Sequence, residues 1–307
     1  MQSPIDRKLL SSLLPRFQFI TIPTLLSFIL IAEANAIVVR HDIPPESFIV
    51  EESDFPAIFP LHDDGNVKDC VATLIAPTWA VTAAHCISDF DKKRISETPH
   101  IVKLLQDKYG IVDFFYPKEF RDDNKAAKSI SIGGLIHITE SDNINYEYDI
   151  ALLKFSKPVK NINPIPLYEG KKEVGKKVIF LGWGDYSTGD TGINRFFSFN
   201  DRKLRRVSNK VDAVSETQLY FDFDDPKSTN SDALPLEGIS GPGDSGGPAL
   251  LKTASGYAIL GISSRGNYSD SLKSKPFNTG KYGWLEFYTR VSGFSKWLND
   301  TMSSQTD

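Results

Sequence analysis

Short apolar runs, separated by turn-forming residues, dominate the chain from residue 37 onward. Four runs of four or five residues are typical of buried strands: 71–75, 150–153, 178–181 and 257–260. Gly, Pro, Asn and Asp cluster between such runs and mark turns. Repeated short strands without alternating helical segments predict an all-β sandwich or barrel.

Three further stretches differ from this pattern. Segments 88–129 and 185–194 lack a sustained apolar period and are predicted to be loops, the first with short elements inside it. Segment 159–172 contains two prolines and a glycine and is the best candidate for a boundary between two halves.

One helix is predicted, at the end of the chain. Phe294, Trp297 and Leu298 recur at helical spacing, which favours a helix over about 292–302. Ser292 or Ser295 is the expected cap, because a serine hydroxyl accepts a hydrogen bond from an unpaired N–H of the first turn.

Residues 1–36 are typical of a secretory signal peptide. Basic residues come first, an apolar run covers 17–32, and Ala34-Asn35-Ala36 offers small residues for cleavage. The alternative is a retained membrane anchor, but the run is shorter than the roughly 20 residues that span a bilayer. Pro23 also interrupts it. We therefore expect cleavage, a mature chain of 37–307, and a secreted protein, extracellular or periplasmic.

Composition narrows the classes of partner. The chain has 35 Lys and Arg against 39 Asp and Glu, a net charge of −4, with both signs mixed. No polybasic run is present, so neither nucleic acid nor an anionic membrane is an expected partner. The two cysteines, Cys70 and Cys86, would meet an oxidising compartment after export, which favours a disulfide over two reduced thiols.

The strongest chemical signal is Gly243-Asp244-Ser245-Gly246-Gly247. A serine hydroxyl becomes a nucleophile when a base removes its proton, and the oxyanion formed on attack needs hydrogen-bond donors. Glycines let backbone N–H groups supply those donors without obstruction by Cβ. The same segment fits the G-x-S-x-G elbow of α/β-hydrolases, which requires a catalytic His after the Ser. The last histidine is His137, so that fold is excluded.

The base and its orienting acid therefore come from upstream. His85 follows an apolar run and adjoins Cys86, whereas the other four histidines lie in polar contexts and are interpreted as surface or structural: His41, His62, His100 and His137. Asp149 directly precedes the apolar run 150–153, which can bury and fix a carboxylate. Taken alone, this residue is equally typical of a turn or cap. Neighbouring Asp142 and Glu147 lack such a run.

Three segments in this order resemble the trypsin/chymotrypsin family of serine proteases: Thr82-Ala83-Ala84-His85-Cys86, Asp149-Ile150-Ala151-Leu152-Leu153 and Gly243-Asp244-Ser245-Gly246-Gly247-Pro248. Weaker matches keep the order: Gly182-Trp183-Gly184, Tyr288-Thr289-Arg290-Val291 and Trp297. The resemblance covers about 37–297 and is specific when the segments are taken together.

The resemblance implies two six-stranded antiparallel β-barrels with a C-terminal α-helix. The expected limits are 37–165 for the first barrel, 166–291 for the second and 292–302 for the helix. It also implies a serine endopeptidase that hydrolyses peptide bonds through an acyl-enzyme, active once the signal peptide is removed. The alternative is a catalytically inactive, protease-like binding module, which would need a damaged triad or oxyanion hole, and neither is visible.

The resemblance also assigns roles to single residues. His85 is expected to be general base and then general acid, Asp149 to hold its tautomer, and Ser245 to attack the carbonyl. The N–H groups of Gly243 and Ser245 would form the oxyanion hole. Cys70–Cys86 matches the family disulfide beside the catalytic His.

A new N-terminus usually activates such proteins by pairing with the Asp before the catalytic Ser. Here that residue is Asp244, and signal cleavage would leave Ile37-Val38 at the N-terminus. We therefore expect Ile37 and Asp244 to be the activation pair, formed by export itself. Two glycines usually follow, but this chain has Val39-Arg40, which puts the turn geometry in question.

The expected specificity pocket departs from that of trypsin. Ile239 stands six residues before Ser245, where trypsin-like members have Asp, so a trypsin-type basic preference is not supported there. Glu286 aligns with a wall position that is often glycine and would either attract Lys or Arg or narrow the pocket. Arg265 replaces the usual Trp. The remaining matched positions are Ser240, Gly266 and Ser264. The last of these matches a family serine that supports the buried Asp.

The expected partners are protein or peptide substrates and protein inhibitors. No nucleic acid and no stable membrane association after signal cleavage are expected, and a monomer is predicted. No cofactor is expected. The sequence has no H-E-x-x-H motif and no His/Cys cluster with metal-ligand spacing, so no metal is expected either.

Overall fold

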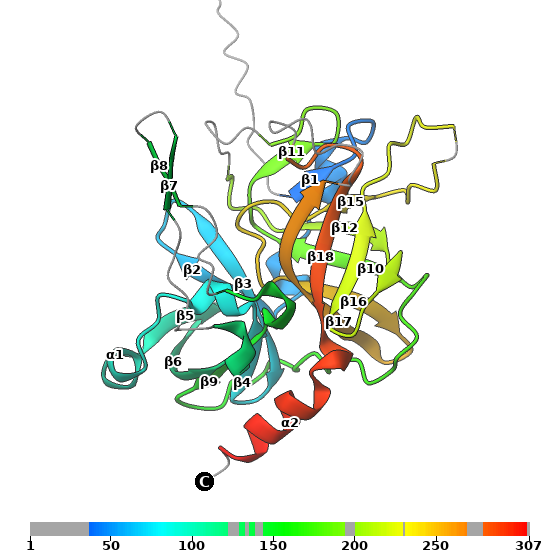
Figure 1. Ribbon diagram of the computed structural model, residues 1–307. Helices are drawn as coiled ribbons and strands as arrows, with labels where there is room; N and C mark the ends of the chain where they lie inside the picture. Colours follow the sequence, from blue (N-terminus) through cyan, green and yellow to red (C-terminus); the bar gives the residue numbers. More distant parts are fainter. Residues whose placement is uncertain are drawn as a thin grey trace, which may run out of the picture. The chain divides into compact units, whose positions relative to one another are not determined.

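The computed structural model describes residues 37–121, 129–132, 135–138, 144–193, 200–229, 231–268 and 279–305 (Figure 1). For 129–132, 135–138, 267 and 268 it describes the backbone only. All of these residues belong to one compact unit, Ala34–Asp307. The expected signal peptide, 1–36, lies outside them. None of their helices has the length and apolar character needed to cross a bilayer.

The first sheet has six strands, all paired antiparallel, in the order β2-β3-β4-β9-β6-β5. Its two edge strands, β2 and β5, also pack against each other, so the sheet curls towards a barrel. The central strands β3, β4 and β9 are buried at most or all of their positions, whereas the edge strand β5 alternates between buried and less buried residues. The strands are β2 (Ile58–Asp63), β3 (Lys68–Ala76), β4 (Trp79–Thr82), β5 (His100–Leu104), β6 (Asp107–Phe115) and β9 (Ala151–Phe155).

The second sheet has seven antiparallel strands in the order β12-β10-β16-β17-β18-β14-β13, one more than expected. The additional strand is β13, two residues long, which pairs only with β14 at the sheet edge. The fold is therefore the expected all-β class with two curled antiparallel sheets. The strands are β10 (Lys177–Gly182), β12 (Arg205–Lys210), β13 (Ala213–Val214), β14 (Gln218–Asp222), β16 (Pro248–Thr253), β17 (Gly256–Tyr268) and β18 (Trp284–Arg290).

A small third sheet contains the first strand of the described chain. β1 (Ile37–Val39) pairs parallel with β11 (Tyr186–Thr188) and antiparallel with β15 (Gly238–Ile239). β1 thus joins strands from the second half of the chain. The barrel limits 37–165 and 166–291 stay predictions. A further hairpin consists of β7 (Ser129–Ile132) and β8 (Leu135–Ile138).

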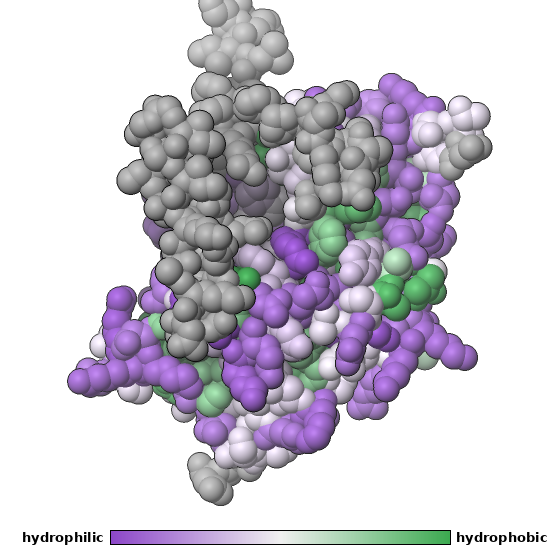
Figure 2. Space-filling view, viewed as in Figure 1, coloured by the Kyte–Doolittle hydropathy of each residue, from purple (hydrophilic) through white to green (hydrophobic). Residues whose placement is uncertain are grey.

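Two large apolar clusters form most of the core: one belongs to the second sheet, and the larger one centres on the first sheet but also includes Leu250, Ile259 and Ile262 of the second. In the second sheet, the rings of Phe180, Phe221 and Tyr288 pack together with centroids 4.6 to 5.2 Å apart. In the first, Phe59 and Phe155 meet at 6.0 Å within a larger aliphatic cluster. Figure 2 shows that the visible surface is mostly hydrophilic, with small apolar patches between polar side chains.

The terminal helix has a different cap from the one expected. The terminal helix α2 (Ser295–Ser303) follows the 3-10 turn Val291–Gly293, and Phe294 occupies its cap position without a side-chain hydrogen bond. The predicted serine cap is therefore wrong: Ser295 Oγ donates instead to the Ser292 carbonyl. In the part of the chain that the structure describes, the remaining 3-10 turns are Pro45–Phe48, Glu52–Asp54, Ala84–Ile87, Lys118–Phe120 and Tyr146–Tyr148.

The segment 88–129, predicted as a loop with short elements inside it, contains helix α1 (Lys92–Glu97) and the strands β5 and β6, so its described part is more regular than expected. β5 is the edge strand of the first sheet and β6 is its neighbour, and both carry exposed charged residues: Lys103 in β5, and Asp107 and Lys108 in β6. Because of these charged residues, the two strands could not be recognised from the apolar pattern of the sequence alone. In α1, the Asp91 side chain accepts a hydrogen bond from the Arg94 N–H at 2.7 Å and caps the helix.

Candidate active site

His85 and Asp149 meet because the strands next to them are paired. β4 ends at Thr82, opposite Ala151 at the start of β9, and the two residues lie just beyond these ends. His85 Nδ1 lies 2.7 Å from Asp149 Oδ2, and the His85 backbone N–H donates to Asp149 Oδ1 at 2.9 Å. An ionised carboxylate only accepts hydrogen bonds, so Nδ1 carries the proton and Nε2 is left as a base.

The Asp149 carboxylate is fully buried and hydrogen-bonded. Burial opposes its ionisation, but the charge of His85 and hydrogen bonds from His85 and Ser264 outweigh burial and lower the pKa of Asp149. Ser264 Oγ donates to Asp149 Oδ2 at 2.6 Å. For His85, burial lowers the pKa, yet the attraction of Asp149 prevails and the pKa lies above 6.5. The pair is therefore arranged to stabilise an imidazolium.

The predicted disulfide is confirmed: Cys70 and Cys86 are bonded, with their Cα atoms 6.0 Å apart. It ties β3 to the turn that carries His85. Cys86 Sγ lies 3.9 Å from His85 Nε2 and 3.5 Å from the Ser245 carbonyl oxygen. The disulfide thus lies between the catalytic candidates, and because both sulfurs are oxidised they offer no thiolate to a metal beside His85.

Ser245 lies in a glycine turn held against β3. The Val71 N–H donates to the Ser245 carbonyl at 2.7 Å. Gly243 and Gly246 have φ of +93° and +79°, and a Cβ on Gly246 would lie 2.3 Å from the Val71 carbonyl oxygen, so this turn requires glycine. Within the described chain, the N–H groups of Gly243 and Ser245 donate to no protein acceptor. No hydrogen bond joins His85 Nε2 to Ser245 Oγ there.

Asp244 points into the protein, where two backbone groups hold it. Its Oδ1 accepts from the Gly184 N–H at 2.7 Å and its Oδ2 from the Gly241 N–H at 2.8 Å. A Cβ on Gly182 would lie 1.9 Å from Oδ1, which explains the glycines around Trp183. Burial raises the pKa of Asp244 to about 7. No Lys, Arg or His side chain of the described chain forms an ion pair with it.

Ile37, the expected partner of Asp244, is buried in β1 among apolar side chains. It follows Ala36 in this chain, so its nitrogen is an amide and carries no charge. Its φ is +68°, a strained value for a β-branched residue. Further along, the Arg40 guanidinium pairs with Asp42 at 2.8 Å and donates to the Leu234 carbonyl at 2.7 Å.

A cavity of about 170 Å³ lies beside Ser245. Four of the five expected pocket residues line it: Ser240, Ser264, Gly266 and Glu286. Ile239 does not; it is fully buried in β15, opposite Val38, and packs into the core. Arg265, expected in place of the usual Trp, also lines it, and the sequence interpretation missed the other lining residues, namely Ile193, Gly241, Pro242, Ser263, Thr279, Gly280 and Trp284. Trp284 lies two residues before Glu286 on the same strand, so the two side chains share one face of the sheet. This spacing could have identified Trp284 from the sequence.

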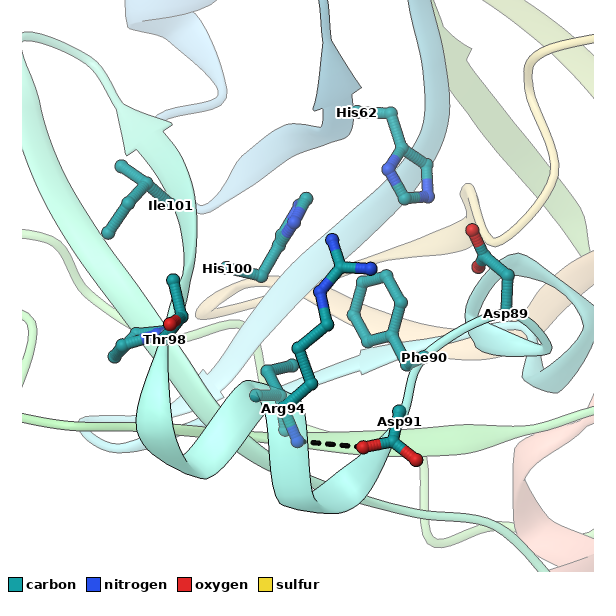
Figure 3. A pocket seen from close by; sticks show the side chains of 10 residues that line it. His62, Asp89, Phe90, Asp91, Arg94, Thr98, His100 and Ile101 are labelled. Atoms are coloured by element: carbon teal, nitrogen blue, oxygen red, sulfur yellow. Dashed lines mark hydrogen bonds between the residues drawn. The ribbon is translucent and has the colours of Figure 1, made fainter.

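A larger cavity, of about 350 Å³, lies between α1 and the first sheet, with Arg94 extending towards His62 and His100 (Figure 3). His62 Nε2 donates to the Cys86 carbonyl at 3.1 Å, and His100 Nε2 donates to the Leu61 carbonyl at 2.7 Å. These contacts agree with a structural role. The same holds for His41, whose Nδ1 lies 2.7 Å from the Tyr282 hydroxyl. The side chain of His137 lies outside the described residues.

Comparison with known proteins identifies the class. Residues 50–298 match the family model described as Trypsin, so the chain belongs to the trypsin family. Among solved structures, neuropsin, described as a serine protease expressed in the limbic system of mouse brain, superposes with a TM-score of 0.56 at 18% identity, over 83% of this chain and 98% of that one. At this identity the likeness shows the fold.

Three curated relatives are similar in sequence. Phenoloxidase-activating factor 3 of Holotrichia diomphalia is 26% identical over 76% of this chain and 64% of its own length. Transmembrane protease serine 11E of Mus musculus is 28% identical over 81% and 52%. The suppressor of tumorigenicity 14 protein homolog of Bos taurus is 30% identical over 44% and 15%. The chain therefore spans between 15% and 64% of the lengths of these relatives.

Proposed function

We propose that this protein is a secreted serine endopeptidase in which His85, Asp149 and Ser245 form the catalytic triad. The observation that carries this proposal is the contact between His85 Nδ1 and the buried Asp149 carboxylate, 2.7 Å long and supported by Ser264. It sets the imidazole tautomer that leaves Nε2 free to take a proton. Proteases among the relatives support the same activity.

In this mechanism Ser245 Oγ attacks the substrate carbonyl carbon while its proton passes to His85 Nε2. Asp149 stabilises the resulting imidazolium. The oxyanion accepts hydrogen bonds from the N–H groups of Gly243 and Ser245, each worth about 3 kcal/mol in such sites. His85 then protonates the leaving amine, and an acyl-enzyme on Ser245 remains. A water molecule, deprotonated by His85, hydrolyses this ester and releases the second product.

Activation would follow cleavage between Ala36 and Ile37, which creates an ammonium group at residue 37. Asp244 supports this step, because a buried carboxylate without a cation gains stability from an ammonium partner. The strained φ of Ile37 supports it as well, since cutting the preceding peptide bond removes that torsion. If signal peptidase makes the cut, export and activation are one event, and the protein acts outside the cytoplasm on protein or peptide substrates.

One observation favours a second candidate, a binding module without activity. The described structure has no hydrogen bond between His85 and Ser245. Such bonds are often long in a protein without substrate and shorten on binding, so the enzyme is the better-supported function.

A fluorophosphonate probe separates the two candidates, because covalent labelling requires an activated serine. Protein that begins at Ile37 should be labelled at Ser245, with no labelling in Ser245→Ala and strongly slowed labelling in His85→Ala. Asp244→Asn should react slowly as well, because the ammonium loses its partner. An unlabelled but folded protein with the correct N-terminus would refute the enzyme and support the binding module.

A further inference from the structure

The cavity beside Ser245 contains a buried carboxyl group, that of Glu286 on β18. Glu286 is 4% exposed yet lines the cavity. Its Oε2 accepts from Ser240 Oγ at 2.9 Å and its Oε1 accepts from Trp284 Nε1 at 2.7 Å. A Cβ on Gly266 would lie 2.6 Å from Oε1, so the carboxyl group is pressed against the backbone of β17. The group is therefore fixed in place at the cavity wall.

No basic side chain of the described chain pairs with Glu286. The acidic group that acts on it is Asp244. Ser240 Oγ, which donates to Glu286, also lies 3.0 Å from the Tyr288 hydroxyl. The nearest cation in sequence on β17, Arg265, is directed elsewhere. Its guanidinium lies 4.9 Å from the Phe287 ring centroid and 5.5 Å from that of Tyr146, and 3.6 Å from Glu147.

Burial is the main cause that raises the pKa of Glu286, to about 8, and the negative charge of Asp244 adds to it. With the cavity empty at neutral pH, the carboxyl group is therefore mostly protonated and neutral. A basic side chain entering the cavity would reverse this balance, because an opposite charge within hydrogen-bond distance favours the carboxylate. The proton of Glu286 would then leave to bulk water, and an ion pair would remain in the cavity.

We propose that Glu286 makes this cavity a pocket with two selectivities: it takes uncharged side chains while its carboxyl group is protonated and Lys or Arg side chains once it is ionised. The inference rests on the proposed function, in which the side chain next to the cleaved bond enters the cavity beside Ser245. At about 170 Å³ the cavity admits one side chain rather than a larger ligand. Ile239, being apolar and outside the cavity, contributes no charge.

Two peptide substrates that differ only in Arg or citrulline before the cleaved bond test the proposal. The two side chains have nearly the same shape, and Arg stays charged throughout the pH range used. The ratio of their kcat/KM values, measured from pH 6 to 10, cancels the titration of His85 and of the N-terminus, which affect both substrates alike. We expect the Arg/citrulline ratio to rise about tenfold per pH unit across this range, because the ionised fraction of Glu286, which favours Arg, grows below about pH 8 and the protonated fraction, which favours citrulline, shrinks above it.

Glu286→Gln keeps the shape of the side chain but cannot ionise. We expect it to cleave the citrulline peptide and to give a low ratio that does not change with pH. Glu169→Gln, which removes an exposed carboxylate outside the cavity, is the matched control and should keep the wild-type pH dependence of the ratio. A flat ratio in the wild type, or a pH-dependent ratio in Glu286→Gln, would overturn the proposal.

A binding experiment tests the pocket without catalysis. Titration calorimetry of Ser245→Ala protein with benzamidinium, in two pH 7 buffers of different ionisation enthalpy, should show release of close to one proton per ligand. Benzamide should release none, and neither should benzamidinium with Ser245→Ala/Glu286→Gln protein. If neither peptide is cleaved while this proton release is seen, the proposed function fails and the charge-dependent pocket stands. Binding without proton release, or no binding, contradicts the pocket.

Discussion

Cutting the chain between Ala36 and Ile37 should raise the free energy of unfolding at neutral pH, and the gain should depend on Asp244. In the uncut chain the pKa of Asp244 is raised from 3.8 to about 7 by burial. The folded state therefore binds this proton more tightly than the unfolded state does. The stability that this bound proton contributes is complete below pH 4 and is lost as the pH rises through about 7.

The size of the effect follows from the pKa values. A difference of about three units corresponds to about 4 kcal/mol, at roughly 1.4 kcal/mol per unit. If the new ammonium of Ile37 pairs with Asp244, the pKa of Asp244 falls below its ordinary value and this loss no longer occurs. We therefore expect the cut and uncut proteins to unfold alike near pH 4 and to differ by about 4 kcal/mol near pH 7.

Urea unfolding between pH 4 and 8 measures this difference. One protein begins at Ile37 and the other keeps residues 34–36 before it, and both carry Ser245→Ala to prevent self-digestion. The same pair with Asp244→Asn is the control and should show little difference at any pH, because no carboxylate is left to pair. A stability gap that does not change with pH, or one that survives Asp244→Asn, would refute the activation pair.

Three further predictions concern contacts around the site. Ser264→Ala should lower kcat/KM by about 10- to 100-fold, because a hydrogen bond to the charged Asp149 is worth about 1.5–3 kcal/mol; an unchanged pH-rate profile with an unchanged rate would contradict this. Glu173→Gln should lower the free energy of unfolding by about 3–5 kcal/mol, since it removes the negative charge and one of the two oxygens that accept from Arg290 at 2.9 and 3.0 Å and leaves a largely buried cation, as urea midpoints would show. Reducing Cys70–Cys86, which are 16 residues apart, should cost about 3 kcal/mol in the same assay, and a loss below about 1 kcal/mol would argue against the disulfide as a stabilising element.

The sequence alone was sufficient for the fold class and for the three catalytic candidates. Continuous apolar runs such as 150–153 form buried strands of the two curled sheets. Such runs are predictable because a strand that is covered on both faces has apolar residues at successive positions. The position of His85 after one run, and of Asp149 before another, placed both at strand ends that pair. In β5 and β6, exposed charged residues interrupt the apolar pattern, so the sequence did not predict these two strands.

The charge environment of the site was decided by tertiary structure. Glu286 and Ser240 are 46 residues apart in sequence and hydrogen-bonded in space, while Ile239, next to Ser240, faces the core. Sequence position left it open whether Glu286 meets solvent, an ion-pair partner or a cavity. A pKa depends on burial and on every charge nearby, and these come from segments that the chain brings together only when it folds. The catalytic candidates can therefore be named from the sequence, whereas the protonation of the carboxyl groups beside them is a property of the folded molecule.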